Sequence, residues 1–161
     1  MVKLKGVIIE APAFGFDDPP MALKVALGKL FAPLLPTFTV DNEVNPEDIS
    51  RIPEEVERYR NDPMIHRRIS LMTAKTLFDY QEWLREECNE EIKFSFPMLL
   101  CHGTADRITS PSCSEMVYKK IKCVDKTLKM YKDAYHSLHN DTDSDQVLSD
   151  WLEWLNERIN E

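Results

Sequence analysis

Two runs of the sequence are apolar on both sides of an extended chain, and they constrain the fold more than any other feature. Residues 6–12 (GVIIEAP) end at a proline, and residues 96–103 (FPMLLCHG) end at a glycine. A strand with one face in water alternates apolar and polar residues, whereas a strand covered by helices on both faces is apolar throughout. Both runs therefore predict strands that are buried in a parallel sheet.

The rest of the chain predicts one irregular segment, a third strand and several helices. Residues 37–63 are polar, acidic and interrupted by prolines, which predicts an excursion with one or two helical turns. Residues 126–136 (KTLKMYKDAYH) alternate and predict the third strand. Apolar residues at helical spacing predict helices over residues 22–31, 65–87, 110–122 and 143–159. In the last helix the residues expected to face inward are Val147, Leu148, Trp151, Leu152, Leu155 and Ile159.

The order of these elements predicts an α/β protein. Strand, helical excursion, strand, helix, strand and helix follow one another, and right-handed crossovers would bring the three strands into one parallel layer. At 161 residues the chain fits one domain. Three parallel strands are few for such a sheet, so we expect the first strand either at an edge or beside a strand that this sequence does not contain. An exposed edge would need a partner chain or another covering.

Charge and cysteine content argue against two classes of function. A formal net charge of -8 argues against nucleic acid as a partner, because phosphate binding requires concentrated lysine and arginine. The four cysteines have no CxxC pair and no zinc-ligand spacing with histidine, so neither a metal nor a cofactor is expected. Cys101 is predicted to lie in the core, while Cys88, Cys113 and Cys123 are predicted to be free thiols.

The location expected from the sequence is the cytoplasm. Free thiols are typical of a reducing compartment. The apolar run that follows Met1 is too short for a signal peptide, and no run approaches the roughly 20 residues of a membrane span.

An acid and a histidine follow the second and the third predicted strands. Asp106 lies in the loop opened by Gly103, and His136 lies in the loop DAYHSLHND. Because the carboxyl ends of parallel strands meet at one edge of a sheet, the two side chains can hydrogen-bond. Such a pair provides the acid and the base of a nucleophile, acid and histidine triad. The plain alternative is that Asp106 caps a turn or a helix and that His136 is solvated.

The residues around this pair favour the catalytic interpretation. FPMLLCHGTADRITSP (residues 96–111), followed by DKTLKMYKDAYHSLHND (residues 125–141), closely resembles the monoacylglycerol lipase and lysophospholipase group of α/β hydrolases, of the serine aminopeptidase S33 type. Residues 6–15 look like the strand after the family's nucleophile helix, and NDP at residues 61–63 looks like part of its cap. The resemblance covers effectively the whole chain and corresponds to the carboxyl-terminal half of the family.

The resemblance implies a partial α/β-hydrolase fold, with about three parallel strands, flanking helices and a helical cap insertion. Residues 1–161 would form a single incomplete domain. Its cap would span about residues 13–87, and its acid and histidine core would span about residues 92–161.

The resemblance also implies roles for individual residues. Asp106 and His136 match the family's acid and general base, which implies a small acyl-ester or lipid substrate. Cap residues such as Leu23, Leu27 and Phe31 would face an acyl chain or a membrane, unless they are simply packed core. Peripheral membrane contact is implied by the resemblance alone.

The family's nucleophile has no counterpart in this sequence. A nucleophile elbow has the pattern G-x-S-x-G, but no two glycines are four positions apart. Cys101 is expected in the core, and Ser137 is expected to point away from its neighbour His136. The serines expected to cap the following helix are Ser110, Ser112 and Ser114. The chain by itself is therefore expected to have little or no ester hydrolase activity, because the members of a triad act as a unit.

Two patterns resemble metal sites but lack the ligands that such sites require. DTDSDQ (residues 141–146) opens like a calcium loop, yet Gln146 stands where a glycine is required and Leu152 where a glutamate is required. His136 and His139 have the spacing of a ligand pair but no further positioned ligands. Residues 141–146 are instead expected to begin a helix.

Three hypotheses follow from the sequence. In the first, the chain is the acid and histidine half of a serine ester hydrolase. In the second, it is a noncatalytic binding or interaction protein of the same ancestry. In the third, it does not fold alone, because losing the central strands leaves apolar surface uncovered.

Overall fold

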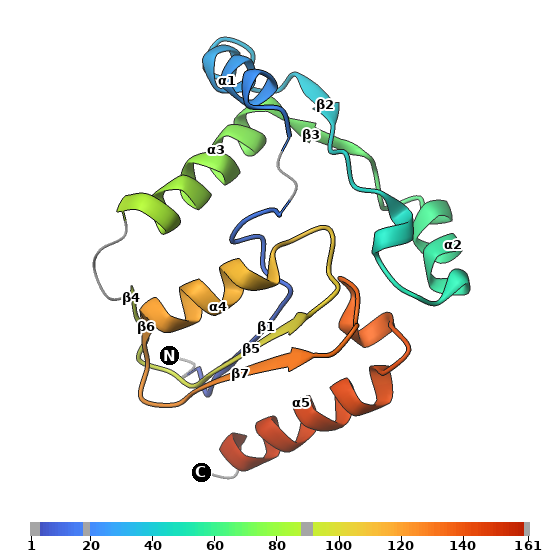
Figure 1. Cartoon of the computed structure of the whole chain (residues 1–161), viewed down its shortest axis with the longest axis vertical. Coiled ribbons are helices and arrows are strands. Elements are labelled where there is room, and N and C mark those ends of the chain that lie inside the picture. Colours follow the sequence, from blue (N-terminus) through green and yellow to red (C-terminus); the bar gives the residue numbers. More distant parts are fainter. Residues whose placement is uncertain (1–3, 18–19, 88–91, 160–161) are drawn as a thin grey trace.

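A parallel sheet of three strands lies in the lower half of the molecule as drawn in Figure 1. The computed structural model describes residues 4–17, 20–87 and 92–159. The strands lie in the order β1 (Val7–Glu10), β5 (Met98–Gly103) and β7 (Lys126–Tyr131). Both pairs are parallel, with Ile9 opposite Leu100 and Leu100 opposite Leu128. The predicted parallel layer is confirmed, with the first strand at its edge.

Helices cover both faces of this sheet (Figure 1). Helix α4 (Pro111–Lys120) lies on one face and helix α5 (Ser144–Ile159) lies on the other. Ser110 begins α4 as a cap, since its hydroxyl accepts a hydrogen bond from the amide of Cys113 at 3.3 Å. The predicted α/β architecture with flanking helices is therefore confirmed.

Strand β5 is buried along its whole length, as its apolar sequence predicts. Leu99 and Cys101 join Trp154 of α5 in one apolar cluster. Met98 packs with Val117 of α4 in a second cluster on the opposite face. Burying a side chain of this size stabilises the fold by roughly 1.5–3 kcal/mol. The central strand is thus the element that joins the two helical layers.

The segment from Ala22 to Glu87 forms the other end of the molecule (Figure 1). Its elements are α1 (Ala22–Phe31), β2 (Thr39–Asp41), the 3-10 turn η1 (Pro46–Asp48), α2 (Pro53–Asn61), β3 (Arg68–Ser70), α3 (Leu71–Glu82) and the π-helical turn η2 (Trp83–Glu87). Helix α1 packs against α3, and β2 pairs with β3 in antiparallel register. The helix predicted over residues 22–31 is confirmed.

Two predictions for this segment are wrong in detail. The excursion over residues 37–63 is more regular than expected, because it contains strand β2 and the nine residues of α2. Pro53 is the first residue of α2, where its fixed φ angle suits a helix and its missing amide costs nothing. The helix predicted to start at Ile65 starts at Leu71, because residues 68–70 pair with β2 instead.

The predicted inward face of the last helix is also partly wrong. Leu148, Leu152 and Ile159 are exposed, although Val147 is buried. The face that meets the sheet follows the spacing of Val147, Trp151, Trp154 and Leu155. Apolar residues cover more than one stripe of this helix, so periodicity alone does not determine which stripe is buried.

The cysteines that the structure describes are free thiols. Cys101 is fully buried as predicted, and Cys113 and Cys123 are half-buried. Cys88 lies outside the described residues.

A short parallel pair, β4 (Ile92–Lys93) with β6 (Ile121–Lys122), lies just before β5 and β7 along the chain. In the described parts of the chain, no helix combines the length and hydropathy needed to cross a bilayer.

Main-chain hydrogen bonds hold the loops at the carboxyl ends of the strands together. The amide of Ala105 donates to the carbonyl oxygen of Ala134 at 3.1 Å and joins the loops after β5 and β7. The amide of Ser110 donates to the carbonyl oxygen of Gly15 at 2.9 Å and joins the loops after β5 and β1. Side chains from different loops are therefore held in fixed relative positions.

Gly103 provides a test of this loop packing. A Cβ atom at this position would lie 2.3 Å from the carbonyl oxygen of Ala134 and 2.5 Å from that of Tyr135. Gly103→Ala is expected to lower the free energy of unfolding by roughly 1–3 kcal/mol, since main chain has to move. The control is Gly28→Ala in α1, where nothing lies within 4 Å of the added atom. The control should raise stability by about 0.5–1 kcal/mol in urea titrations. Equal stability of Gly103→Ala and the wild type would contradict the tight packing.

Candidate active site

Asp106 lies in the loop after β5, where its carboxylate is buried inside a tight turn. Its Oδ1 atom accepts hydrogen bonds from the amides of Ile108 at 2.8 Å and Thr109 at 3.0 Å. These bonds fix the carboxylate on its own loop, as is typical of an Asx turn. Asp106 therefore stabilises a turn through its Oδ1 atom, as the plain alternative predicted, and its Oδ2 atom remains available for other partners.

His136 lies in the loop after β7 and meets Asp106. Its Nδ1 atom lies 2.8 Å from Asp106 Oδ2, so the structure brings the two predicted site residues together. The His136 side chain is 27% exposed. Its Nε2 atom makes no hydrogen bond with any residue in the described part of the chain, and His136 lines a cavity of about 460 Å³. The ring therefore has one nitrogen on the acid and another that is free to meet a ligand.

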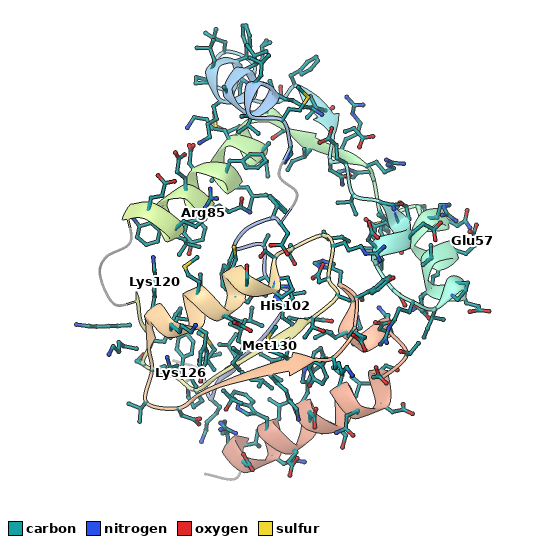
Figure 2. All side chains as sticks on the ribbon, viewed as in Figure 1. Glu57, Arg85, His102, Lys120, Lys126 and Met130 are labelled. Atoms are coloured by element: carbon teal, nitrogen blue, oxygen red, sulfur yellow. The ribbon has the colours of Figure 1, made fainter. Side chains whose placement is uncertain are left out.

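A second histidine, which the sequence interpretation missed, contacts the same carboxylate oxygen. His102 is fully buried between β5 and α4 (Figure 2). Its Nε2 atom lies 3.0 Å from Asp106 Oδ2, and its Nδ1 atom lies 2.7 Å from the hydroxyl of Ser114. A carboxylate only accepts, so Nε2 carries the proton and Nδ1 accepts from Ser114. The signal available in the sequence was a histidine inside an apolar strand.

Thr109 completes the surroundings of the acid. Its hydroxyl lies 2.9 Å from Asp106 Oδ2, 3.2 Å from the carbonyl oxygen of Ala11 and 3.3 Å from His136 Nδ1. Thr109 therefore contacts the acid, the histidine and the loop after β1. Nothing in its sequence position distinguished it from the neighbouring helix-capping residues.

These contacts keep Asp106 ionised. Burial by itself would raise the pKa of the Asp106 carboxyl, but the hydrogen bonds from His102 and His136 outweigh it. The pKa of Asp106 therefore lies well below its usual range. A permanent negative charge at this position requires a proton on His136 Nδ1 and leaves Nε2 of the neutral ring as a base.

The serines and cysteines weighed as nucleophiles all have other contacts. Burial raises the pKa of the Cys101 thiol to about 11, so that it stays protonated. The hydroxyl of Ser137 accepts a hydrogen bond from Asn140 Nδ2 at 3.1 Å. Ser114 was expected to cap α4, but it binds His102 instead. Among the described residues, no serine or cysteine is hydrogen-bonded to His136.

The two histidines of HSLH do not act as a pair. His139 Nδ1 lies 2.8 Å from Glu10 Oε2, at the end of β1, whereas His136 faces Asp106. Within the described ranges, no group of three histidine, cysteine or acidic side chains could hold a metal ion. Asp141, the first residue of the calcium-like pattern, binds Arg51 instead.

A larger apolar cavity lies beside the one that His136 lines. Its volume is about 530 Å³, and Val44 and Ile108 line both cavities. Its apolar lining comes from Phe16, Val25, Leu27, Phe31, Ile69, Leu77 and Phe78. A cavity of this size and character can hold an apolar chain of a small ligand.

The fold and this site define the class of the protein. A parallel sheet with helices on both faces carries an acid and a histidine at the carboxyl ends of neighbouring strands. This is the architecture of the α/β hydrolases, in which the acid and histidine follow the nucleophile in chain order.

The chain belongs to the serine aminopeptidase S33 family, whose model matches residues 2–143. It is 33% identical to an uncharacterized abhydrolase domain-containing protein of Dictyostelium discoideum, over 96% of this chain and 16% of that protein. It is 31% identical to the caffeoylshikimate esterase of Arabidopsis thaliana, over 96% of this chain and 48% of the esterase. The crystal structure of the Paleococcus ferrophilus monoacylglycerol lipase matches with a TM-score of 0.86 at 32% identity, over 97% of this chain and 60% of the lipase. The chain thus spans less than two thirds of the length of each of these relatives.

The low pKa of Asp106 predicts how stability depends on pH. The unfolded carboxyl has a pKa of about 3.9. Because the folded pKa is lower, the stabilising contribution is complete above roughly pH 5 and is lost as the pH falls through the folded pKa. The difference in free energy of unfolding between the wild type and Asp106→Asn should therefore be largest near neutral pH and shrink toward acid. Urea titrations at several pH values measure it.

The exposed acid Asp145, in the first turn of α5, offers a matched control. Asp145→Asn should change stability little at any of these pH values. A wild-type advantage over Asp106→Asn that stayed constant down to acid pH would rule out the ionised network.

Proposed function

We propose that this chain carries the acid and the general base of a serine ester hydrolase similar to monoacylglycerol lipases. The observation that carries the proposal is the 2.8 Å contact between His136 Nδ1 and Asp106 Oδ2, with the other ring nitrogen on a cavity. The serine that this chemistry requires is proposed to lie in the part of the family's length that these residues do not span. The chain by itself is then inactive.

The proposed mechanism gives each member of the pair one task. Nε2 of His136 would take the proton from a serine hydroxyl as the serine attacks the ester carbonyl carbon. Asp106 would hold Nδ1–H and stabilise the imidazolium that forms. The same Nε2–H would then return the proton to the leaving alcohol, and a water molecule would repeat the sequence to release the acid.

The edge of β1 is the proposed site for the missing strand. The amide of Val7 donates to the carbonyl oxygen of Pro97, just before β5, and the amide of Ala11 donates to that of Cys101 in β5. The alternate amides of Ile8 and Glu10 therefore face the other side. An open edge of this kind pairs readily with another strand. We propose one incomplete hydrolase domain, with a cap at about residues 13–87 and a core at about residues 92–161. A strand from the rest of the protein, or from a partner chain, would extend the sheet beyond β1.

The proposed substrate is a small ester with an apolar acyl chain. The apolar cavity of about 530 Å³ adjoins the cavity at His136, so an acyl chain in the first would bring its ester to the second. Similarity to a monoacylglycerol lipase supports a monoacylglycerol, and similarity to caffeoylshikimate esterase supports a larger polar ester. The apolar lining favours the monoacylglycerol.

The chain alone should not react as a serine hydrolase. A fluorophosphonate probe labels an activated serine, and no described serine is hydrogen-bonded to His136. We expect no labelling of the purified chain and no hydrolysis of 4-nitrophenyl butyrate above the rate in buffer. The Paleococcus ferrophilus lipase, labelled in parallel, is the positive control. Labelling of the chain would reveal a serine nucleophile within these residues and overturn its proposed inactivity.

Joining the chain to upstream sequence separates the catalytic proposal from a noncatalytic one. An in-frame G-x-S-x-G in the genomic sequence upstream of the Met1 codon, expressed with this chain, should give hydrolysis. His136→Ala should lower the rate of hydrolysis roughly a thousandfold or more, whereas His139→Ala should leave most of the activity. Hydrolysis that persists in His136→Ala would contradict the proposed role of His136 as the general base. Absence of any such upstream motif would favour a noncatalytic binding protein of the same ancestry.

Two leucines on α1 test the acyl cavity. Leu27 lines it, whereas Leu23 does not and is more exposed. Leu27→Glu is expected to weaken binding of monodecanoylglycerol roughly tenfold or more in calorimetry, because a carboxylate would then border the acyl chain. Leu23→Glu should leave that binding unchanged. Equal losses in the two variants would contradict an acyl site in this cavity.

Leu23→Glu also tests the proposed peripheral membrane contact. No residue of α1 is fully buried, so its leucines are not packed core. Leu23 and Leu30 are each 66% exposed, and a helix with such a face can bind a lipid surface. Leu23→Glu should therefore lower the fraction of protein that cosediments with phosphatidylcholine vesicles. Unchanged cosedimentation would count against membrane contact through α1.

A further inference from the structure

Two contacts outside the acid and histidine pair hold the main chain on both sides of His136. The amide of Tyr135 donates to Asp141 Oδ2 at 2.8 Å. The amide of Ser137 donates to the carbonyl oxygen of Ile49 at 2.9 Å. Since Tyr135 and Ser137 are the immediate neighbours of His136, these bonds fix the direction in which its side chain leaves the backbone.

Asp141 is buried and fully hydrogen-bonded. Its side chain is 1% exposed, and its Oδ1 atom accepts from the amide of Arg51 at 2.8 Å. The Arg51 Nε atom donates to Oδ2 at 2.9 Å. Burial by itself would raise the pKa of Asp141, but the bonds from the amides of Tyr135 and Arg51 and from the Arg51 side chain lower it. A charged carboxylate thus joins two segments that are 90 residues apart in sequence.

Neighbouring groups reinforce this connection. The hydroxyl of Ser50, a buried residue, donates to the carbonyl oxygen of Asn140 at 2.6 Å. Arg51 Nη2 donates to Asp143 Oδ2 at 2.8 Å. We call Ile49, Ser50 and Arg51, together with Asp141, the histidine-loop clamp.

The histidine loop needs such a clamp because it has little structure of its own. Between the end of β7 and the start of α5, its one regular element is the 3-10 turn η3 (Leu138–Asn140). A loop without a helical or strand hydrogen-bond ladder takes its geometry from tertiary contacts. A general base that moves by about 1 Å loses much of its effect, so the position of this loop matters for function.

We propose that Asp141 and Arg51 are positioning residues that hold His136 against Asp106. They act through the main chain of Tyr135 and touch neither the ester nor the serine. The inference rests on the proposed role of His136 as the general base, and it identifies the segment at residues 49–51 as the structure on which that role depends. Breaking the clamp frees the imidazole to leave the acid while the rest of the sheet stays folded.

The tautomer of His136 tests this proposal without any substrate. A neutral imidazole whose Nδ1–H binds a carboxylate carries its proton on Nδ1, whereas a ring released into water favours Nε2. Nitrogen-15 spectra of the full chain at mildly alkaline pH report the two forms, and His136→Gln identifies the signals. We expect the Nδ1–H form to dominate in the wild type and to fall roughly twofold or more in Asp141→Asn and Arg51→Gln.

The two variants together separate positioning from simple electrostatics. Asp141→Asn removes a negative charge and Arg51→Gln removes a positive one, so a charge effect would shift the tautomer ratio in opposite directions. Loss of positioning would shift the tautomer ratio in the same direction in both variants. Arg51 is partly exposed, so Arg51→Gln keeps the test available if Asp141→Asn fails to fold.

Two further variants calibrate the measurement. Asp106→Asn removes the acceptor itself and defines the spectrum of a released ring. Asp150→Asn removes another buried acid, which binds the hydroxyl of Tyr131 and the ammonium group of Lys129 away from the clamp. Asp150→Asn should cost stability but keep the wild-type tautomer.

The outcomes are separable. Folded Asp141→Asn and Arg51→Gln chains that retain the wild-type tautomer ratio would reduce the clamp to a structural role and overturn the inference. A wild-type chain with the proton on Nε2 would contradict the proposed function itself. Absence of esterase activity affects neither reading, because no ester is present.

Discussion

Strand β5 must be covered on both faces, and the rest of the structure follows from that requirement. All six of its residues are buried, and alternate side chains enter two separate apolar clusters. A helix has to cover each face, because the fold would lose most of the stability gained by burying these apolar side chains if they were exposed to water. The same strand ends at Gly103, where a side chain would collide with the loop after β7. The close approach of these two loops brings Asp106 to His136.

The site depends on a charge that is buried yet fully satisfied. The two oxygens of Asp106 accept from two main-chain amides, a threonine hydroxyl and two imidazole rings. An ion removed from water without such partners would be neutralised, so the hydrogen bonds are what keep the carboxylate charged. That charge in turn sets which nitrogen of His136 carries the proton. Asp141 repeats this arrangement in the loop after β7, with an arginine and main-chain amides as partners.

The choice of a catalytic pair over a turn residue and a solvated histidine depended on the resemblance to a known family. Apolar pattern and chain order were sufficient to predict the sheet, α1 and the position of Asp106 and His136 at neighbouring strand ends. Each of these depends on local periodicity or on the general rule that strand ends converge. The same reasoning failed for α5, where Leu148 and Leu152 were expected inside and are exposed. It also missed strand β2, in which residues 39–41 pair with residues 68–70, and it expected one or two helical turns where α2 has nine residues. Pairing between distant segments has no signal in the local sequence.

The α/β class, the order of most elements and the position of Asp106 and His136 at neighbouring strand ends follow from the amino-acid sequence alone, because burial periodicity and strand ends are properties of nearby residues. Which other groups surround that pair depends on the packing of the whole chain. His102, Thr109 and Ser114 reach the acid or one another through packing of β5 against α4, and Arg51 reaches Asp141 across 90 residues of chain. Such contacts depend on where the backbone carries each side chain in space, and that is fixed by the packing of the whole core.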